Sequence, residues 1–131
     1  MNTDTKALFE RYAEAWGTHD PDAIVALHTT DTVFHLHAGQ EPAHGREAVR
    51  EAFAGFLTLI PDLGWEQRSL IVGDDFWVVE WRMTGTTADG KQVDADLADV
   101  VTVEDGLVKS KQSYADSVTL QAQLDLAEVP A

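Results

Sequence analysis

The stretch FWVVEWRMTGTTADGKQVDADLADVVTV, from Phe76 to Val103, decides the fold. Two β-rich segments with alternating apolar and polar side chains flank the turn sequence Asp89–Gly90. A second Asp-Gly pair at 105–106 leads into LVKSKQSYA, residues 107–115, and WEQRSLIV, residues 65–72, precedes the whole stretch. The second half of the chain is therefore predicted to be four long strands joined by hairpins.

The first half of the chain has helical periodicity. Apolar side chains recur at helical spacing from Thr3 to Trp16, and Asp20 followed by Pro21 is an N-cap signal for a short second helix. REAVREAFAGFL, residues 46–57, predicts a third helix, and TVFHLH, residues 32–37, a short strand. We therefore predict one α+β domain over residues 1–131, with three N-terminal helices on the concave face of a curved antiparallel sheet.

Composition narrows the class of function. The formal charge is −14, from nine basic and 23 acidic residues, so nucleic acids and anionic membranes would be repelled. The chain has no cysteine, which excludes disulfides, thiolate metal sites and a cysteine nucleophile. No apolar run is long enough for a membrane helix, and the N-terminus lacks signal-peptide character. We expect a cytoplasmic protein with a small, mostly apolar organic ligand and no cofactor.

Three of the five histidines lie in VFHLHAGQEPAHG, residues 33–45. His35 and His37 have the spacing to share a metal with Glu80 or His44, but a His-x-His pair alone is a weak signal, and no metal is expected. Histidines of the surface or of loop packing are the simpler interpretation. His28 is assigned to a helix end, where the helix dipole favours its protonated form.

Several segments resemble one superfamily. RYAEAWGTHDPDAIVAL (11–27) is similar to the first two helices of ketosteroid isomerases, and GREAVREAFAGF (45–56) to the third helix of SnoaL-like polyketide cyclases. DVVTVEDGLV (99–108) and SYAD (113–116) resemble the last hairpin of both families and of limonene epoxide hydrolases. The resemblance implies a cone-shaped α+β barrel of the nuclear transport factor two-like superfamily. This fold carries enzymes, binding proteins and assembly modules, so it does not specify the activity.

The resemblance to ketosteroid isomerases implies an oxyanion hole. Tyr12 stands at the position of that family's tyrosine, and Asp99 at the position of its carboxylic acid, which stays protonated in that family and so donates a hydrogen bond. Asp99 also alternates with Leu97 and Val101, so it shares their face of the strand. The alternative is that Tyr12 is a core residue and that Asp99 pairs with a neighbour.

That family also has a carboxylate base on the short strand, and its position falls on Leu36 here. An aliphatic side chain cannot take a proton, so this route of steroid isomerisation is not supported. Strand alternation directs Phe34 and Leu36 into the pocket and the two neighbouring histidines away from it. A slip of one residue would exchange the faces.

Limonene epoxide hydrolases carry an Arg and an Asp two residues apart on the strand that resembles FWVVEWRMT, residues 76–84 of this chain. Here Glu80 and Arg82 occupy these positions with the charges exchanged, and Ser113 replaces a second Asp. We expect Glu80 to face the cavity as an alternative base, with Arg82 beside it. A purely structural ion pair is the competing interpretation.

The opposite face of the same strand carries Trp77, Val79, Trp81 and Met83. If this face is convex, four large apolar side chains predict a homodimer through the sheet. If the faces are reversed, these residues are core and Glu80 and Arg82 lie in solvent. Asp99 distinguishes the two, because it must point the same way as Glu80 in the first arrangement.

Two functions follow from these features. The first is an enzyme for proton transfer on a neutral carbonyl compound, as in an isomerisation, cyclisation or dehydration of a polyketide or steroid. Its catalytic groups would be Tyr12, Asp99, Glu80 and Arg82, and its pocket would be lined by Trp16, Phe34, Leu36, Phe53, Trp65 and Ser113. The second is a non-catalytic ligand-binding or dimerisation module, which would have the same fold and a filled or passive pocket.

Overall fold

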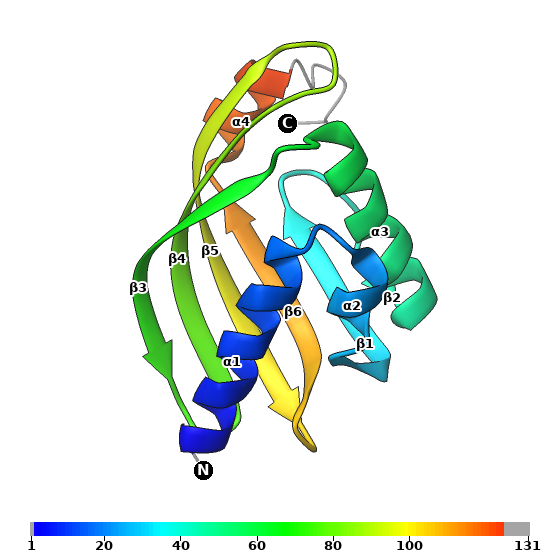
Figure 1. The fold of residues 1–131 in the computed structure, drawn as a ribbon, viewed down its shortest axis with the longest axis vertical. Helices are drawn as coiled ribbons and strands as arrows, with labels where there is room; N and C mark the ends of the chain where they lie inside the picture. Colours follow the sequence, from blue (N-terminus) through cyan, green and yellow to red (C-terminus); the bar gives the residue numbers. More distant parts are fainter. Residues whose placement is uncertain (1, 125–131) are drawn as a thin grey trace.

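The computed structural model describes residues 2–124 and is an α+β domain with one curved sheet and four helices (Figure 1). In chain order the elements are α1 (Asn2–Gly17), α2 (Pro21–Val25), β1 (His28–His37), β2 (Ala43–His44), α3 (Arg46–Leu59), β3 (Gly64–Val72), β4 (Phe76–Thr86), β5 (Gln92–Glu104), β6 (Leu107–Ala115) and α4 (Ser117–Leu124). Within residues 2–124, no helix is both long enough and apolar enough to cross a membrane.

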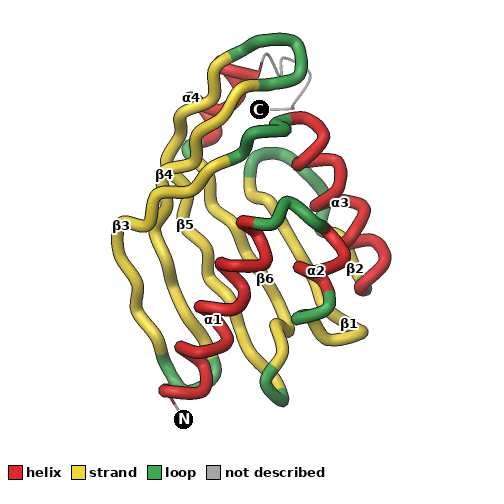
Figure 2. The backbone as a smooth tube through the Cα atoms, in the orientation of Figure 1, coloured by secondary structure: helices red, strands yellow, loops and turns green. Residues whose placement is uncertain are grey.

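The sheet has six strands in the order β2-β1-β6-β5-β4-β3 and stays open (Figure 2). The strands from β3 to β6 form the predicted antiparallel meander. The predicted antiparallel sheet is confirmed for every strand pair but one, since β1 pairs with β6 in parallel. Parallel pairing needs a long crossover between the strands, and α3 with the four intervening strands, β2 to β5, provides it.

The turn and cap signals of the sequence are confirmed. Gly90, Asp105 and Gly106 all have positive φ, at 91°, 54° and 75°, as tight hairpin turns require. The side chain of Asp20 accepts a hydrogen bond from the backbone N–H of Asp22 at 2.9 Å and caps α2 ahead of Pro21. These local signals explain why the element boundaries follow the sequence closely.

Helices α1, α2 and α3 cover the concave face of the sheet, and the core lies between them and the strands (Figure 1). Val49, Phe53 and Leu57 form the buried side of α3, as their helical spacing predicts. From β4, the side chains of Trp77 and Met83 enter the core fully. Burial of each such side chain contributes about 1.5–3 kcal/mol, which fixes the face that β4 turns inward.

The face assignment of β4 is therefore the reverse of the one expected. Trp77, Val79 and Met83 are core, and Val79 rather than Glu80 pairs with Asp99 across the sheet. The prediction of a homodimer interface made by Trp77, Val79, Trp81 and Met83 is wrong, because three of these side chains are buried within the chain and Trp81 points to the same inner side.

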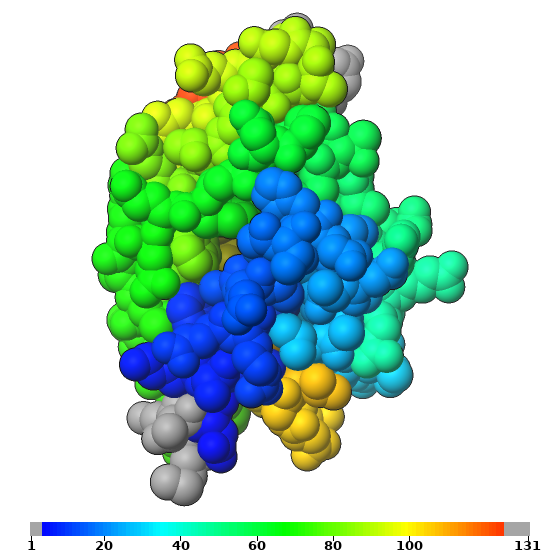
Figure 3. Space-filling view, viewed as in Figure 1, coloured from blue at the N-terminus to red at the C-terminus, as the bar shows by residue number. Residues whose placement is uncertain are grey.

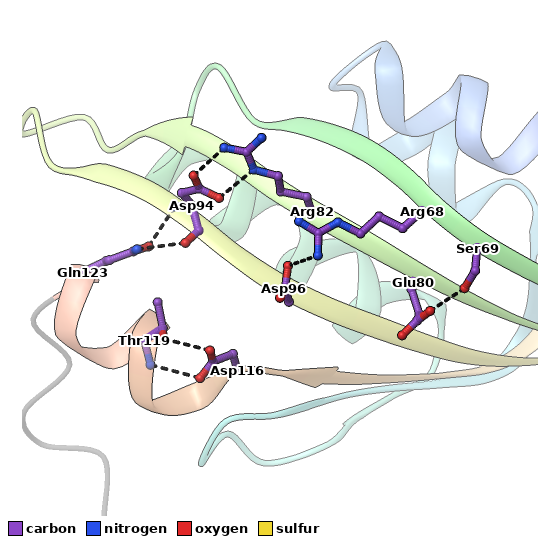
Figure 4. Close-up of polar contacts among 9 residues, drawn as sticks. All are labelled: Arg68, Ser69, Glu80, Arg82, Asp94, Asp96, Asp116, Thr119 and Gln123. Atoms are coloured by element: carbon purple, nitrogen blue, oxygen red, sulfur yellow. Dashed lines mark hydrogen bonds and ion pairs between the residues drawn. The ribbon is translucent and has the colours of Figure 1, made fainter.

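Glu80 and Arg82 lie on the outer face, where each has a partner other than the one expected (Figure 4). Ser69 donates a hydrogen bond to Glu80, and Arg82 makes a two-bond contact with Asp94 at 2.9 and 2.7 Å. Arg68 pairs with Asp96 on the same face. The predicted placement of Glu80 and Arg82 in the cavity is wrong, and these charges belong to a solvent-exposed polar surface.

Candidate functional site

A pocket of about 410 Å³ lies between α1 and the sheet. It opens between α1 and β3, where the molecular surface is hollowed (Figure 3). Its walls are mainly aromatic, and all four tryptophans of the chain contribute to them. Its lining residues include Tyr12, Ala13, Trp16, Trp81, Asp99 and Lys111. A concave, mostly apolar cavity with a few polar groups is the usual form of a small-molecule site.

A buried ion pair forms the polar part of this pocket. Lys111 Nζ donates a hydrogen bond to Asp99 Oδ2 at 2.9 Å, and the two side chains are only 8% and 6% exposed. The strand register explains the contact, because Asp99 pairs with Ser113 and Val101 with Lys111 on the same face of β5 and β6. Two charges this deeply buried require each other, since either alone would lack compensation.

Asp99 accepts two more hydrogen bonds. Ser113 Oγ donates to Oδ1 at 2.6 Å, and Trp81 Nε1 donates to Oδ2 at 3.1 Å. Ammonium and indole N–H groups can only donate, so Asp99 is the acceptor in its contacts with Lys111 and Trp81. Asp99 is thus arranged as an acceptor, in contrast to the protonated donor that the resemblance to ketosteroid isomerases implies.

Lys111 is a polar residue of the pocket that is not among the predicted site residues. Its ammonium lies 5.4 Å from the centre of the Tyr12 ring and 5.6 Å from that of Trp16, within cation–π range of both. A lysine on a strand is ordinarily expected to be exposed. A signal was nevertheless present, because the alternation that directs Ser113 inward applies equally to Lys111, two residues earlier.

Tyr12 and Asp99 both line the pocket but make no hydrogen bond to each other. The Tyr12 hydroxyl instead makes a 2.9 Å hydrogen bond with His28 Nε2, and His28 Nδ1 makes one of 2.8 Å with Thr32 Oγ1. Burial raises the pKa of the Tyr12 phenol above its usual range, and nearby Asp99 adds to the rise. Tyr12 is therefore a neutral phenol that can donate or accept a hydrogen bond, but not a phenolate base.

His28 begins β1 and is fully buried, so its assignment to a helix end that favours the protonated form is wrong. Burial is the main cause that lowers its pKa to about 3, with further contributions from the positive charges of Lys111 and Arg46. A neutral imidazole has one donor and one acceptor. When Nε2 carries the proton, Tyr12 accepts from it and keeps its own O–H free for a ligand.

The other predicted pocket residues fall into three places. Trp16 and Trp65 line the main pocket. Phe34, Leu36 and Ser113 line a second space of only about 20 Å³, which Trp16, Trp65 and the Asp99–Lys111 pair also border. Phe53 is fully buried and packs edge-on against Trp16 and Phe34. The inward orientation of Phe34 and Leu36 is confirmed.

The paired histidines point away from the pocket. His37 bonds Gln112 at 2.7 Å and stacks on Tyr114, and His35 bonds the backbone oxygen of Gln40. Among residues 2–124 there is no group of three or more His, Cys, Asp or Glu side chains that could hold a metal ion.

Comparison with solved structures shows the same fold in several bacterial proteins. A putative SnoaL-like polyketide cyclase from Jannaschia sp. CCS1 is 22% identical, with a TM-score of 0.83 over 94% of this chain and 92% of the other. A hypothetical protein with a ketosteroid isomerase-like fold from Catenulispora acidiphila DSM 44928, in complex with trimethylamine, is 20% identical, with a TM-score of 0.80 over 90% of this chain and 92% of the other. A putative polyketide cyclase from Bacillus cereus is 26% identical, with a TM-score of 0.76 over 95% and 82%.

No curated protein matches the sequence. The family model of the SnoaL-like domain, in contrast, matches residues 9–111, which include the aromatic pocket, Asp99 and Lys111. On this match the chain belongs to the family of SnoaL-like domains.

Proposed function

We propose that the protein is a small-molecule enzyme that moves a proton on a neutral, mostly apolar carbonyl compound bound in the aromatic pocket. The observation that carries this proposal is the buried Asp99–Lys111 pair on the wall of a cavity of about 410 Å³. The cavity has room for a compact ring system, and its walls offer aromatic faces for stacking. The reaction class is that of an isomerase, cyclase or dehydratase.

The polar groups have complementary roles in this proposal. The Lys111 ammonium polarises the carbonyl oxygen and stabilises the negative charge that develops on it as the adjacent carbon loses a proton. The Tyr12 hydroxyl is a second donor to the same oxygen when His28 Nε2–H occupies its acceptor side. Asp99 holds Lys111 in place and is the nearest carboxylate to receive the proton.

The expected base, Glu80, has no part in this mechanism, because it lies exposed on the outer face. Leu36 occupies the position of the base in ketosteroid isomerases and borders the small inner space. Proton abstraction in this pocket therefore depends on Asp99, whose carboxylate oxygens already accept three hydrogen bonds.

Because these three donors occupy the carboxylate, one alternative is favoured as well: a non-catalytic binding protein that uses the pocket for affinity alone. Incubation with small cyclic ketones in D₂O, followed by NMR, distinguishes the two functions. An enzyme of the proposed class exchanges protons next to the carbonyl faster than buffer does, and Asp99→Asn removes the excess. Binding without any exchange above the buffer rate would leave only the non-catalytic function.

We further propose that two copies of the chain form a homodimer through the outer face of the sheet, with a different apolar set from the one expected. Ile71, Phe76 and Tyr114 are 63%, 38% and 48% exposed. Ile71 pairs with Val78, and Val78 with Val100, so partly buried valines connect this set across the sheet. Apolar side chains that gather on one open face favour contact with a second surface.

A further inference from the structure

We infer that Lys111 condenses with an aldehyde or ketone ligand to form an imine in the aromatic pocket. This inference rests on the proposed small-molecule site and makes its chemistry more specific: the ligand would be held covalently through its carbonyl carbon. The wall of the pocket supplies an amine, a proton acceptor and a setting that stabilises the resulting cation.

Lys111 differs from the other three lysines of the chain in its surroundings. The side chains of Lys91 and Lys109 are 40% and 34% exposed, against 8% for Lys111. Lys6 is exposed on α1. Lys111 alone among these lysines lines the aromatic pocket, so an apolar carbonyl compound that enters the pocket meets this amine. Amines become effective nucleophiles in such partly desolvated sites.

Asp99 can carry the protons that the condensation requires. Its Oδ2 lies 2.9 Å from Lys111 Nζ and accepts one proton from the ammonium, which frees the nitrogen lone pair. The amine forms a bond to the carbonyl carbon, and Asp99 returns the proton to the oxygen to give a carbinolamine. A second N–H proton then passes through Asp99 to the hydroxyl group, the C–O bond breaks, and water leaves as the C=N bond forms. Asp99 ends as a carboxylate, and no oxidant or reductant is consumed.

The product of this step is a protonated imine, whose positive charge lies where the ammonium charge was. The same partners therefore stabilise the cation before and after condensation. These are the Asp99 carboxylate and the ring faces of Tyr12 and Trp16. Because the aromatic walls also limit access of water, return of the imine to amine and carbonyl is slowed.

The test is reductive trapping with a small aldehyde. The full chain is incubated with sub-stoichiometric benzaldehyde and sodium cyanoborohydride, and the modified peptides are located by mass spectrometry. The inference predicts modification mainly at Lys111. Asp99→Asn is expected to slow trapping at that position, since the nearest proton acceptor is then lost.

Two matched variants complete the test. Lys111→Arg keeps the positive charge but has no amine, and we expect it to lose the adduct. Lys109→Arg changes a lysine two residues away and can keep the contact with Asp31. We expect this variant to be modified at Lys111 like the wild type. In the wild-type protein, labelling spread evenly over the exposed lysines would overturn the inference. This result does not depend on whether any variant folds. If benzaldehyde binds and quenches tryptophan fluorescence but gives no Lys111 adduct, the imine is excluded while the proposed binding site stands.

Discussion

Lys111 and Asp99 form an ion pair of 2.9 Å between neighbouring strands, and both side chains are more than nine-tenths buried. The pair comes from β5 and β6 and faces an aromatic cavity. It therefore links the stability of the sheet to the chemistry proposed for the pocket.

Removal of one partner of this pair should be strongly destabilising. Lys111→Met leaves the Asp99 charge buried without compensation, which typically costs about 3–5 kcal/mol in the free energy of unfolding. The double variant Lys111→Met with Asp99→Asn removes both charges and should recover much of the loss. Urea unfolding of the two single variants and the double variant measures this coupling, and Arg82→Gln on the solvent-exposed outer face is the control with a small effect. Simple additivity of the two single losses would contradict a coupled pair.

His28 predicts a pH dependence of stability. Its pKa is about 3 in the folded protein and near its ordinary value of 6.5 in the unfolded chain. Between these two pH values the unfolded state binds more protons than the folded state, so the free energy of unfolding falls as the pH decreases through this window. Above a pH of about 6.5, His28 is neutral in both states and the loss is absent. The slope from this one group approaches 1.4 kcal/mol per pH unit in the middle of the window.

Urea unfolding at pH 7, 6 and 5 measures this slope, and comparison with His28→Gln isolates it from the carboxylates. We expect the wild type to lose more stability than the variant between pH 6.5 and 5. Parallel pH profiles would show that His28 is not held neutral by burial.

Tyr12→Phe tests the second donor of the proposed site. Loss of the Tyr12–His28 hydrogen bond should cost about 0.5–1.5 kcal/mol of stability. Proton exchange of a bound ketone should fall at least tenfold, about 1.4 kcal/mol in the barrier. Ser110→Ala on the outer face removes a comparable hydroxyl and hydrogen bond, with Thr102, and should leave exchange unchanged. An unaltered exchange rate in Tyr12→Phe would exclude the tyrosine from the reaction.

Ala13→Phe should block ligand entry without any change to the polar groups. Ala13 lines the pocket from α1, and a phenyl ring there would occupy part of its volume. All four tryptophans border the same space, so ligand binding is measured by tryptophan fluorescence. We expect quenching by small aromatic ketones in the wild type and much weaker quenching in the variant. The matched control is Ala98→Phe, since Ala98 lies on β5 and faces the outer side of the sheet with Glu80 and Tyr114.

The fold was largely predictable because local signals agree with it. Helical spacing, the Asp20–Pro21 cap and the two Asp-Gly turns each have a direct counterpart in the structure. The parallel pairing of β1 with β6 was not predictable in this way, because it joins segments more than 70 residues apart and no turn specifies it.

The site was predicted only in part. The alternation of side chains assigns the residues of β4 to two faces, but it does not tell which of them lies on the concave face of the sheet. The charges of Glu80 and Arg82 suggested a site, whereas the large apolar set of Trp77 and Met83 determined the buried face. Asp99 was placed correctly because its neighbours Leu97 and Val101 are apolar. The burial of His28 and Lys111 is not predicted, because polar side chains are rarely this buried. Strand alternation directs Lys111 inward, but only the tertiary partners of these two side chains explain how they are accommodated there.

A crystal structure of the protein with a small aromatic ketone is the decisive test of a carbonyl-binding site at the Asp99–Lys111 pair. We expect density for the ligand among the tryptophans, with its carbonyl within hydrogen-bond distance of Lys111 Nζ or its carbonyl carbon bonded to that atom. A ligand bound elsewhere, with the Asp99–Lys111 pair out of its reach, would show that the pair does not form the binding site.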